Sequence, residues 1–228
     1  MAAELKEYVE TSVKRFEEDF LKKVRPTEDN VPQFKSALQC LATDLNFRIS
    51  RYEERLAWLE VKCDDRDDEQ EQYSRRNCLL IHGIPEVQKE GMTDGVVLKC
   101  LNSTVLKDNE LKLCWRDLDR SHRIGKKNNN GKPRPIIVKF CSYRMREAVF
   151  RNKRNLKGST LLITESLTRR RLGWLKDMKK VLGDRQVWSQ DGRLYYLRGD
   201  VKGVVQNSLG FAQFQDYCQS QSEVKSVG

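Results

Sequence analysis

The chain has 228 residues, 33% of them charged, and a mean hydropathy of −0.72, which excludes a single large core and suggests one or two small domains with an exposed helical part. No apolar run approaches the roughly 18 residues that a membrane span needs, and the first ten residues carry charges rather than a signal-peptide core. We therefore expect a cytoplasmic protein without membrane contact, with the nucleus as a second location.

The charge is unevenly distributed along the chain. Residues 1–73 carry 12 Lys or Arg against 18 Asp or Glu, whereas residues 116–185 carry 21 Lys or Arg against six Asp or Glu. A positive surplus of this size is costly in self-repulsion unless a polyanion relieves it. Nucleic acid is the expected partner, because no amphipathic anchor or lipidation signal favours an acidic membrane.

Metal and cofactor sites are not expected. The seven cysteines are scattered, no two of them have Cys-x-x-Cys spacing, and the only histidines are His82 and His122. A structural zinc site needs four ligands, usually in closely spaced pairs. We therefore expect reduced thiols.

The N-terminal part is predicted to be helical. Residues 2–25 carry apolar residues at spacings of three and four, and Pro26 and Pro32 enclose a polar break, so residues 1–32 form a helix and a break. Residues 33–74 follow a heptad without Gly or Pro, which predicts a coiled coil. A helix packed on its own domain is the alternative. The expected seam of a dimer or trimer is Leu38, Leu45, Ile49, Tyr52, Leu56 and Leu59.

The sequence changes character at residue 75. The apolar run 78–81 ends in a turn at Gly83 and Pro85 and predicts a buried strand. Five further elements are expected in order: a helix over 93–106, strands over 118–124 and 136–140, a helix over 142–156 and a strand over 161–164. Residues 75–164 thus follow the β-α-β-β-α-β order of ferredoxin-like domains, the fold that RNA-recognition modules use.

Residues 165–217 form a third predicted unit. A helix over 166–182, capped by Ser166, precedes two strands within 187–197, and the Asp191-Gly192 pair between them predicts a hairpin.

The chain should end in a disordered tail at 218–228. The expected class is α+β: an N-terminal coiled-coil helix, a ferredoxin-like RNA-recognition-type domain, and a small α/β C-terminal domain with a helix and a β-hairpin.

Phosphate contacts are expected to dominate binding. The positions where an ordinary RNA-recognition module stacks bases on aromatic rings hold Leu80, Pro135 and Ile137, so base stacking on this sheet is not expected. Basic side chains instead gather at turns and helix ends, where phosphates also meet free backbone N–H groups. The candidates are Arg75, Arg76, Arg123, Lys126, Lys127, Lys132, Arg134, Arg169, Arg170 and Arg171.

Aromatic residues of the third unit have two expected roles. Trp174 and Trp188 are expected to pack in its small core. Tyr195 and Tyr196 point to opposite faces of one strand, and Tyr196 is the candidate for stacking on single-stranded bases.

Catalytic motifs are absent from the sequence. It contains no Walker loop, no Gly-x-Ser-x-Gly elbow and no His-Glu-x-x-His, so we do not expect an enzyme. A metal-dependent nuclease using Asp117 and Asp119 is the catalytic alternative, although solvated loop carboxylates are the commoner explanation.

Four segments carry a family resemblance. SRRNCLLIHGIPE follows the predicted coil directly, and RSHRIGK, RPIIVKF and ITESLTRRRLGWL follow in that order. Together they resemble the first-open-reading-frame protein of LINE-type retrotransposons. Residues from about 160 to 200 are also similar to the C-terminal domain of the baculovirus few-polyhedra protein family.

The LINE-type resemblance implies an oligomer that binds single-stranded RNA or DNA without sequence preference and acts as a nucleic-acid chaperone in a retrotransposon ribonucleoprotein. It implies binding by Arg151, Lys153 and Arg154, and again by residues 169–171. The few-polyhedra resemblance leaves open a coiled-coil scaffold whose basic part binds an acidic protein.

Overall fold

The computed structural model shows a mixed α+β protein, as the sequence predicts. The chain divides into two compact units, Met1–Asp64 and Asp65–Gly228, which we describe separately. Within the described part of the chain, no helix is long and apolar enough to cross a membrane. The structure describes residues 2–23, 31–86, 92–126 and 132–226.

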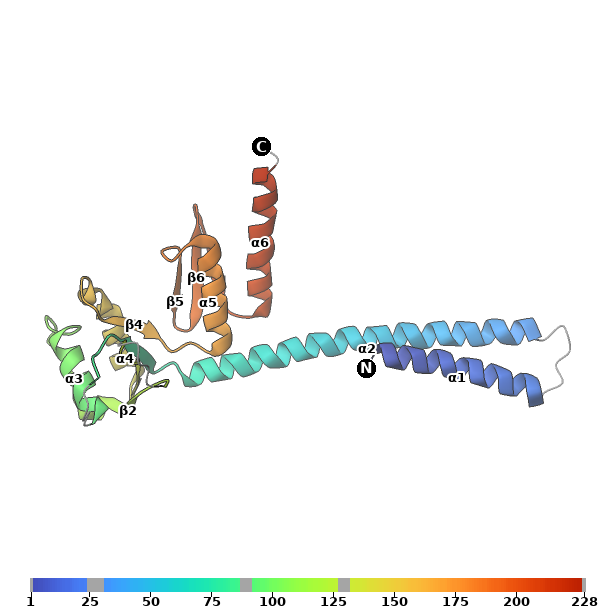
Figure 1. The fold of residues 1–228 in the computed structure, drawn as a ribbon, viewed down its shortest axis with the longest axis horizontal. Helices are drawn as coiled ribbons and strands as arrows, with labels where there is room; N and C mark the ends of the chain where they lie inside the picture. Colours follow the sequence, from blue (N-terminus) through green and yellow to red (C-terminus); the bar gives the residue numbers. More distant parts are fainter. Residues whose placement is uncertain (1, 24–30, 87–91, 127–131, 227–228) are drawn as a thin grey trace. The chain divides into compact units, whose positions relative to one another are not determined.

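The first unit is a pair of helices, α1 (Ala2–Lys23) and the first part of α2 (Val31–Ser74) (Figure 1). Phe20 of α1 stacks on Phe34 of α2 with ring centroids 3.7 Å apart. An ion pair joins Lys6 to Glu53 at 3.6 Å. Because the end of α1 meets the start of α2 and its start meets Glu53, the two helices run antiparallel.

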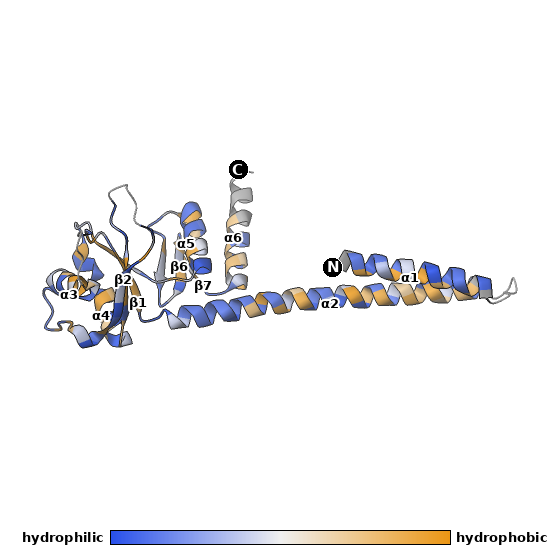
Figure 2. Cartoon of the chain, turned by 60° about the horizontal axis from the view of Figure 1, so that its bottom comes forward, coloured by the Kyte–Doolittle hydropathy of each residue, from blue (hydrophilic) through white to orange (hydrophobic). Residues whose placement is uncertain are grey.

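The predicted seam on α2 is covered only at its N-terminal end. Leu38 is 9% exposed, and Leu45 and Ile49 are half-buried, which places them against α1, the neighbouring helix in this unit. Further along, Tyr52 and Leu56 are each 59% exposed. Leu59 is also exposed, and apolar residues recur along α2 in Figure 2. The coiled coil therefore stays a prediction.

The second unit contains a four-stranded antiparallel sheet. Its strands are β1 (Cys78–His82), β2 (Leu118–Arg123), β3 (Ile136–Phe140) and β4 (Leu162–Glu165), in the order β2-β3-β1-β4. A 3₁₀ turn, η1 (Trp115–Asp117), leads into β2. Strands β2 and β4 are the edges of this sheet, and β4 carries the chain toward the C-terminal part.

Two helices cover one face of this sheet, α3 (Thr93–Ser103) and α4 (Tyr143–Arg151), the latter continued by the 3₁₀ turn η2 (Asn152–Leu156). Alternate strand residues face the helices because successive side chains point to opposite sides of a strand. The resulting core includes Leu79, Ile81, Leu101, Ile136, Val138, Phe140, Val149 and Ile163.

A three-stranded antiparallel sheet follows, with β5 (Val187–Gln190), β6 (Arg193–Arg198) and β7 (Val201–Val205) in that order. Helices α5 (Arg169–Leu182) and α6 (Ser208–Ser226) contribute to the core on one of its faces. The predicted hairpin is confirmed: both turn residues, Asp191 and Gly192, have the positive φ that a tight two-residue turn needs.

Three details differ from the sequence expectations. The cap of α5 is Thr168, whose hydroxyl accepts from the Arg171 backbone N–H, and not Ser166. Strand β7 was not predicted, because its Gly203 interrupts the β-branched run; a Cβ there would lie 2.1 Å from the Tyr196 ring. Helix α6 continues through most of the segment expected to be disordered.

A buried polar cluster joins the end of α2 to the C-terminal part of the second unit. The Arg171 guanidinium, 6% exposed, donates to Asp68 Oδ2 at 2.7 Å and to the Gly192 carbonyl at 2.9 Å. Thr168 Oγ1 donates to Asp68 Oδ1 at 2.5 Å, and Ser208 Oγ donates to Asp65 Oδ1 at 2.6 Å. We call this cluster the α2 clamp; its members are Asp65, Asp68, Gln72, Thr168, Arg170, Arg171 and Ser208.

Candidate nucleic-acid interface

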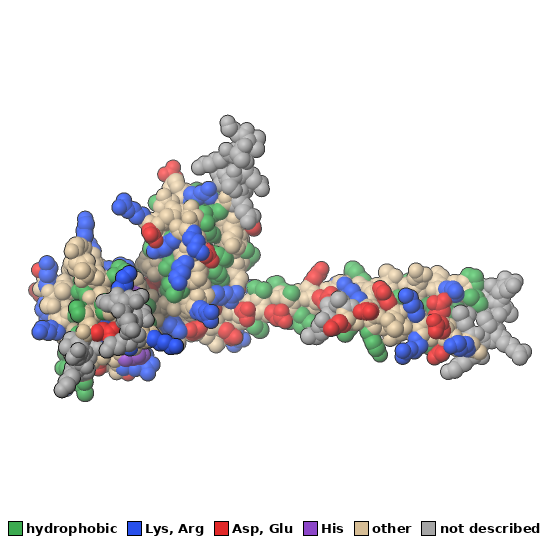
Figure 3. All heavy atoms as spheres, viewed as in Figure 1, with side chains coloured by type: hydrophobic (Ala, Val, Ile, Leu, Met, Phe, Trp, Pro, Cys, Tyr) green, Lys and Arg blue, Asp and Glu red, His purple; other side chains and the backbone are tan. Residues whose placement is uncertain are grey.

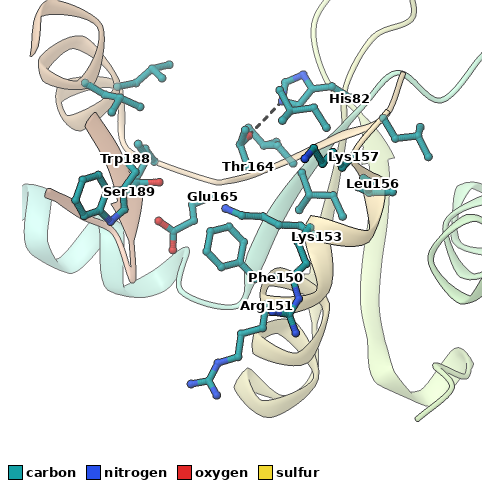
Figure 4. Close-up of a pocket in the computed structure, with 18 of the residues that line it drawn as sticks. His82, Phe150, Arg151, Lys153, Leu156, Lys157, Thr164, Glu165, Trp188 and Ser189 are labelled. Atoms are coloured by element: carbon teal, nitrogen blue, oxygen red, sulfur yellow. Dashed lines mark hydrogen bonds between the residues drawn. The ribbon is translucent and has the colours of Figure 1, made fainter. Parts of the chain in front are cut away.

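A cleft of about 860 Å³ lies in the second unit where the β4 edge faces α5 and β5. Figure 4 shows Phe150 and Lys153 on one side of it and Trp188 and Ser189 on the other. Its walls are largely apolar, and we call it the β4–α5 cleft. Its apolar lining residues are Leu80, Phe150, Leu156, Leu161, Leu162, Ile163, Leu167, Leu172, Leu175 and Trp188.

The charged residues of the cleft are nearly all positive. Five cations line it against one carboxylate, that of Glu165. Two of the cations are paired with acids: Arg151 with Glu147 at 2.7 Å and Lys179 with Asp184 at 3.2 Å. The other three cations form no ion pair with any described residue and are Lys153, Arg154 and Lys157.

Glu165 is neutralised by a neighbouring guanidinium. Its Oε1 accepts a short hydrogen bond from Arg146, and both side chains are almost fully buried. Arg146 also contacts Glu147 at 2.9 Å. The only acid among the described residues that line the cleft is thus held in a buried ion pair, which leaves the cleft with a positive surplus.

A tyrosine contact ties the hairpin to α4 beside this ion pair. Tyr143 Oη donates to Asp191 Oδ1 at 2.6 Å, and this hydrogen bond raises the pKa of Tyr143 to about 12. Arg146 lies 3.7 Å from the same Asp191 oxygen. The turn between β5 and β6 is therefore held next to α4.

Lys153, one of the five cations of the cleft, lies against an aromatic ring. Much of its side chain is exposed, but its ammonium lies over the Phe150 ring, 3.6 Å from the centroid. Desolvation lowers its pKa from the ordinary value of 10.5. Nearby, desolvation also lowers the pKa of His82, whose Nε2 lies 3.2 Å from Thr164 Oγ1 (Figure 4).

The structure brings some predicted binding residues together in this cleft. Arg151, Lys153 and Arg154 all line it. Arg169, at the start of α5, is exposed, but it does not line the cleft.

Arg170 and Arg171 have structural partners instead. Arg170 donates to Ser208 Oγ at 2.5 Å and lies 3.4 Å from Asp65, and its guanidinium stands over the Trp174 ring. Arg171 is buried in the α2 clamp. Of the three consecutive arginines, Arg169 is therefore exposed, whereas Arg170 and Arg171 are bound by other residues of the protein.

Two other arginines that were predicted to bind phosphate form hydrogen bonds to the loops at one end of the four-stranded sheet. Arg123 donates to the backbone carbonyls of Ile84, Pro85 and Arg134 at 3.0, 2.7 and 2.8 Å. Arg134 makes a two-pronged contact with Glu86 and holds the pKa of that carboxyl at about 2. Both guanidiniums are thus occupied within the protein.

The remaining predicted basic residues are spread over the second unit, whose Lys and Arg side chains are prominent in Figure 3. Arg75 donates to Glu71 at 2.6 Å, and Arg76 stands over the Tyr73 ring. Lys126 and Lys132 are exposed, while Lys127 lies outside the described residues.

Tyr196 faces the core rather than the solvent. Its ring makes an edge contact with Phe214, with centroids 4.9 Å apart, and burial raises its pKa. The neighbouring Tyr195 points to the other face of β6 and stacks with Trp188. The expectation that Trp188 is a core residue is therefore wrong, because it is 36% exposed.

Asp117 and Asp119, the two carboxylates of the metal-dependent nuclease alternative, each contact another residue of the protein. Asp117 Oδ2 accepts from the Cys114 backbone N–H at 2.7 Å. Asp119 pairs with Lys139 at 2.8 Å, and this contact lowers the pKa of Asp119. In the described ranges, no three His, Cys, Asp or Glu side chains are grouped to hold a metal ion.

Lys157 and Lys179 line the cleft but were not singled out in the sequence. For Lys179 the sequence did contain a signal. Lys179 follows Leu172 and Leu175 by seven and four residues, a spacing that places all three side chains on the same face of a helix. Lys157 follows a 3₁₀ turn, and nothing in the local sequence places it in the cleft.

No family model matches the chain, and no curated protein sequence matches it.

Proposed function

We propose that the chain binds single-stranded RNA or DNA in the β4–α5 cleft, mainly through phosphates and with little sequence preference. The observation that carries this proposal is the charge of the cleft, which has five lining cations and one acid that is already paired. Phosphate contacts of this kind supply sequence-independent affinity.

The sheet order supports an RNA-recognition-type domain within this proposal. An antiparallel order of β2-β3-β1-β4, with both helices in the core on one face, is the arrangement expected for a ferredoxin-like βαββαβ domain. Leu80 and Ile137 stand opposite each other on the central strands of the other face. Because neither is aromatic, binding in the cleft is favoured over base stacking on this sheet.

The proposal includes self-association through α2, as a retrotransposon nucleic-acid chaperone of the LINE type would require. It is supported by apolar residues that α1 leaves uncovered, among them Tyr52, Leu56 and Leu59. Several copies held together would present several clefts to one strand, and linked sites bind a polymer more tightly than a single site does.

The test compares two double variants of the full chain. Arg154→Gln/Lys157→Gln removes two cleft cations that have no ion pair among the described residues. Lys99→Gln/Arg116→Gln makes the same charge change at exposed residues outside the cleft. Fluorescence anisotropy with a labelled single strand of about 30 nucleotides, longer than a single-strand-binding site, measures affinity across a salt series.

We expect the cleft variant to bind about tenfold more weakly, and its salt slope to fall by about 0.7 for each phosphate that it no longer neutralises. The control variant should keep the wild-type slope. An equal weakening of both variants, or wild-type binding to polyglutamate as tight as to RNA, would contradict the proposal and favour an acidic protein partner.

A further inference from the structure

The face of the second sheet that points away from α5 and α6 carries a row of exposed apolar residues. Strand pairing places Trp188, Tyr195 and Val204 side by side across β5, β6 and β7. Leu197 and Lys202 form the next pair along the same face. Trp188, Val204 and Leu197 are all exposed. A small sheet thus leaves a contiguous apolar surface open to solvent on one side.

The two aromatic rings of this row lie nearly parallel. Trp188 and Tyr195 have centroids 5.9 Å apart and an angle of 14° between their planes. The Lys202 ammonium stands over both rings, 5.9 Å from the Trp188 centroid and 5.5 Å from that of Tyr195. Packing inside the domain does not require this arrangement, because the core is on the opposite face and contains Leu194, Val205 and Phe214.

The charge of this outer face matches a polyanion. Its outward side chains include Lys202 and Arg193, both exposed, and none of the outward side chains on the three described strands is acidic. Flat rings flanked by cations bind unpaired nucleobases, because every base has a π face and each is joined to a phosphate. A partner protein would need acidic groups to meet the same two cations.

The outer face also adjoins the cleft. Trp188 lines the β4–α5 cleft and is the first member of the aromatic row. A strand whose phosphates meet Arg154 and Lys157 in the cleft can therefore continue past Trp188 without leaving the protein surface. Duplex nucleic acid cannot use the rings in this way, since its bases are already stacked and paired.

From these observations we infer that the row of Trp188, Tyr195 and Val204, with Lys202 above it, is a base-stacking site that continues the cleft and selects single strands with unpaired bases. The inference rests on the proposed function, and it adds a contact to bases where the cleft supplies contacts to phosphates. Trp188 is the residue shared by the two.

The experiment compares an ordinary DNA single strand with an abasic strand of the same length, which keeps the phosphates and lacks the rings. Wild type should bind the ordinary strand about tenfold more tightly, because stacking on an aromatic ring contributes a factor of roughly 5 to about 150 for each base. Trp188→Leu keeps apolar bulk but removes the ring. It should lose that preference and bind the abasic strand as wild type does, with an unchanged salt slope.

Tyr195→Leu provides a second variant with the same expected effect, and Trp115→Leu is the matched control, since Trp115 is exposed on η1 and far in sequence from this face. Equal wild-type binding of both strands, with a salt slope that depends on Arg154 and Lys157, would overturn the stacking site and leave the cleft proposal standing. Absence of binding to either strand would overturn both. A Trp188→Leu protein that changes association state in sedimentation would assign this face to contacts between copies instead.

Discussion

Lys153 makes a contact within the protein at the same position where we propose that it binds phosphate. Its ammonium lies on the Phe150 ring at the wall of the cleft, and desolvation lowers its pKa below 10.5. A bound phosphate favours the charged form, so binding raises this pKa again and takes up a proton wherever the free side chain is neutral. Affinity should therefore fall as the pH rises through the lowered pKa of Lys153.

Lys153→Arg tests this linkage, because a guanidinium stays charged throughout the range. Between neutral pH and a pH of about 10, wild type should lose affinity for a single strand several-fold more than the Lys153→Arg protein does. Lys157→Arg, a second exposed cation of the same cleft, is the control. Parallel pH profiles for wild type and Lys153→Arg in anisotropy titrations would rule out a phosphate contact at Lys153.

Individual roles were only partly predictable from the sequence. Arg151, Lys153 and Arg154 lie in the cleft, and the binding role that the resemblance implies for them stays a prediction. Arg171 could not be distinguished from Arg169, because the residue that buries it, Asp68, lies 103 positions earlier in the chain. Side-chain alternation did predict that Tyr195 and Tyr196 face opposite ways, but not which of them faces the solvent.

Among the secondary-structure elements, local signals were the most informative. The Asp191-Gly192 turn fixes the hairpin through its own backbone geometry, so the sequence predicted it correctly. The heptad of α2 identified apolar positions, but a heptad does not specify which helix covers them. In the structure α1 covers Leu38, and Tyr52 stays exposed.

Helix α1 should therefore compete with a second chain for the start of the α2 seam. Phe20→Gln removes the ring that stacks on Phe34, whereas Tyr8→Gln changes an exposed residue of the same helix. Releasing α1 frees leucine-sized side chains worth about 1.5 to 3 kcal/mol each on burial. Phe20→Gln should strengthen self-association in sedimentation velocity by about tenfold or more. An association state equal to that of Tyr8→Gln would show that α1 does not limit it.

On the scale of the whole molecule, the order of elements predicted the α+β class, and the predicted boundary at residue 74 coincides with the end of α2, whereas the compact second unit already includes the last part of that helix. The compact second unit begins at Asp65, because Asp65, Asp68 and Gln72 of α2 are bound by residues of the C-terminal part. A boundary placed at residue 74, where the coil pattern ends, separates Asp65, Asp68 and Gln72 from the C-terminal residues that bind them. No local sequence pattern reveals these long-range contacts.

A fragment of residues 65–228 should accordingly be more stable than one of residues 75–228. The shorter fragment leaves the Arg171 guanidinium buried without Asp68, a loss of about 3 to 5 kcal/mol for a broken buried pair. Urea unfolding followed by circular dichroism measures the difference, with a fragment of residues 60–228 as the control for added helix length. Identical urea midpoints for the 65–228 and 75–228 fragments would show that the α2 clamp contributes nothing.

The α2 clamp also has a consequence for the order in which the protein is made. Asp68 leaves the ribosome about a hundred residues before Arg171, so translation produces the two halves of this ion pair well apart in time. Until Arg171 emerges, Asp65 and Asp68 are hydrated carboxylates without this partner, while the basic segments between them and Arg171 have already been synthesised. The clamp therefore closes only after Arg171 and Ser208 have been synthesised, well after the α2 residues that they bind.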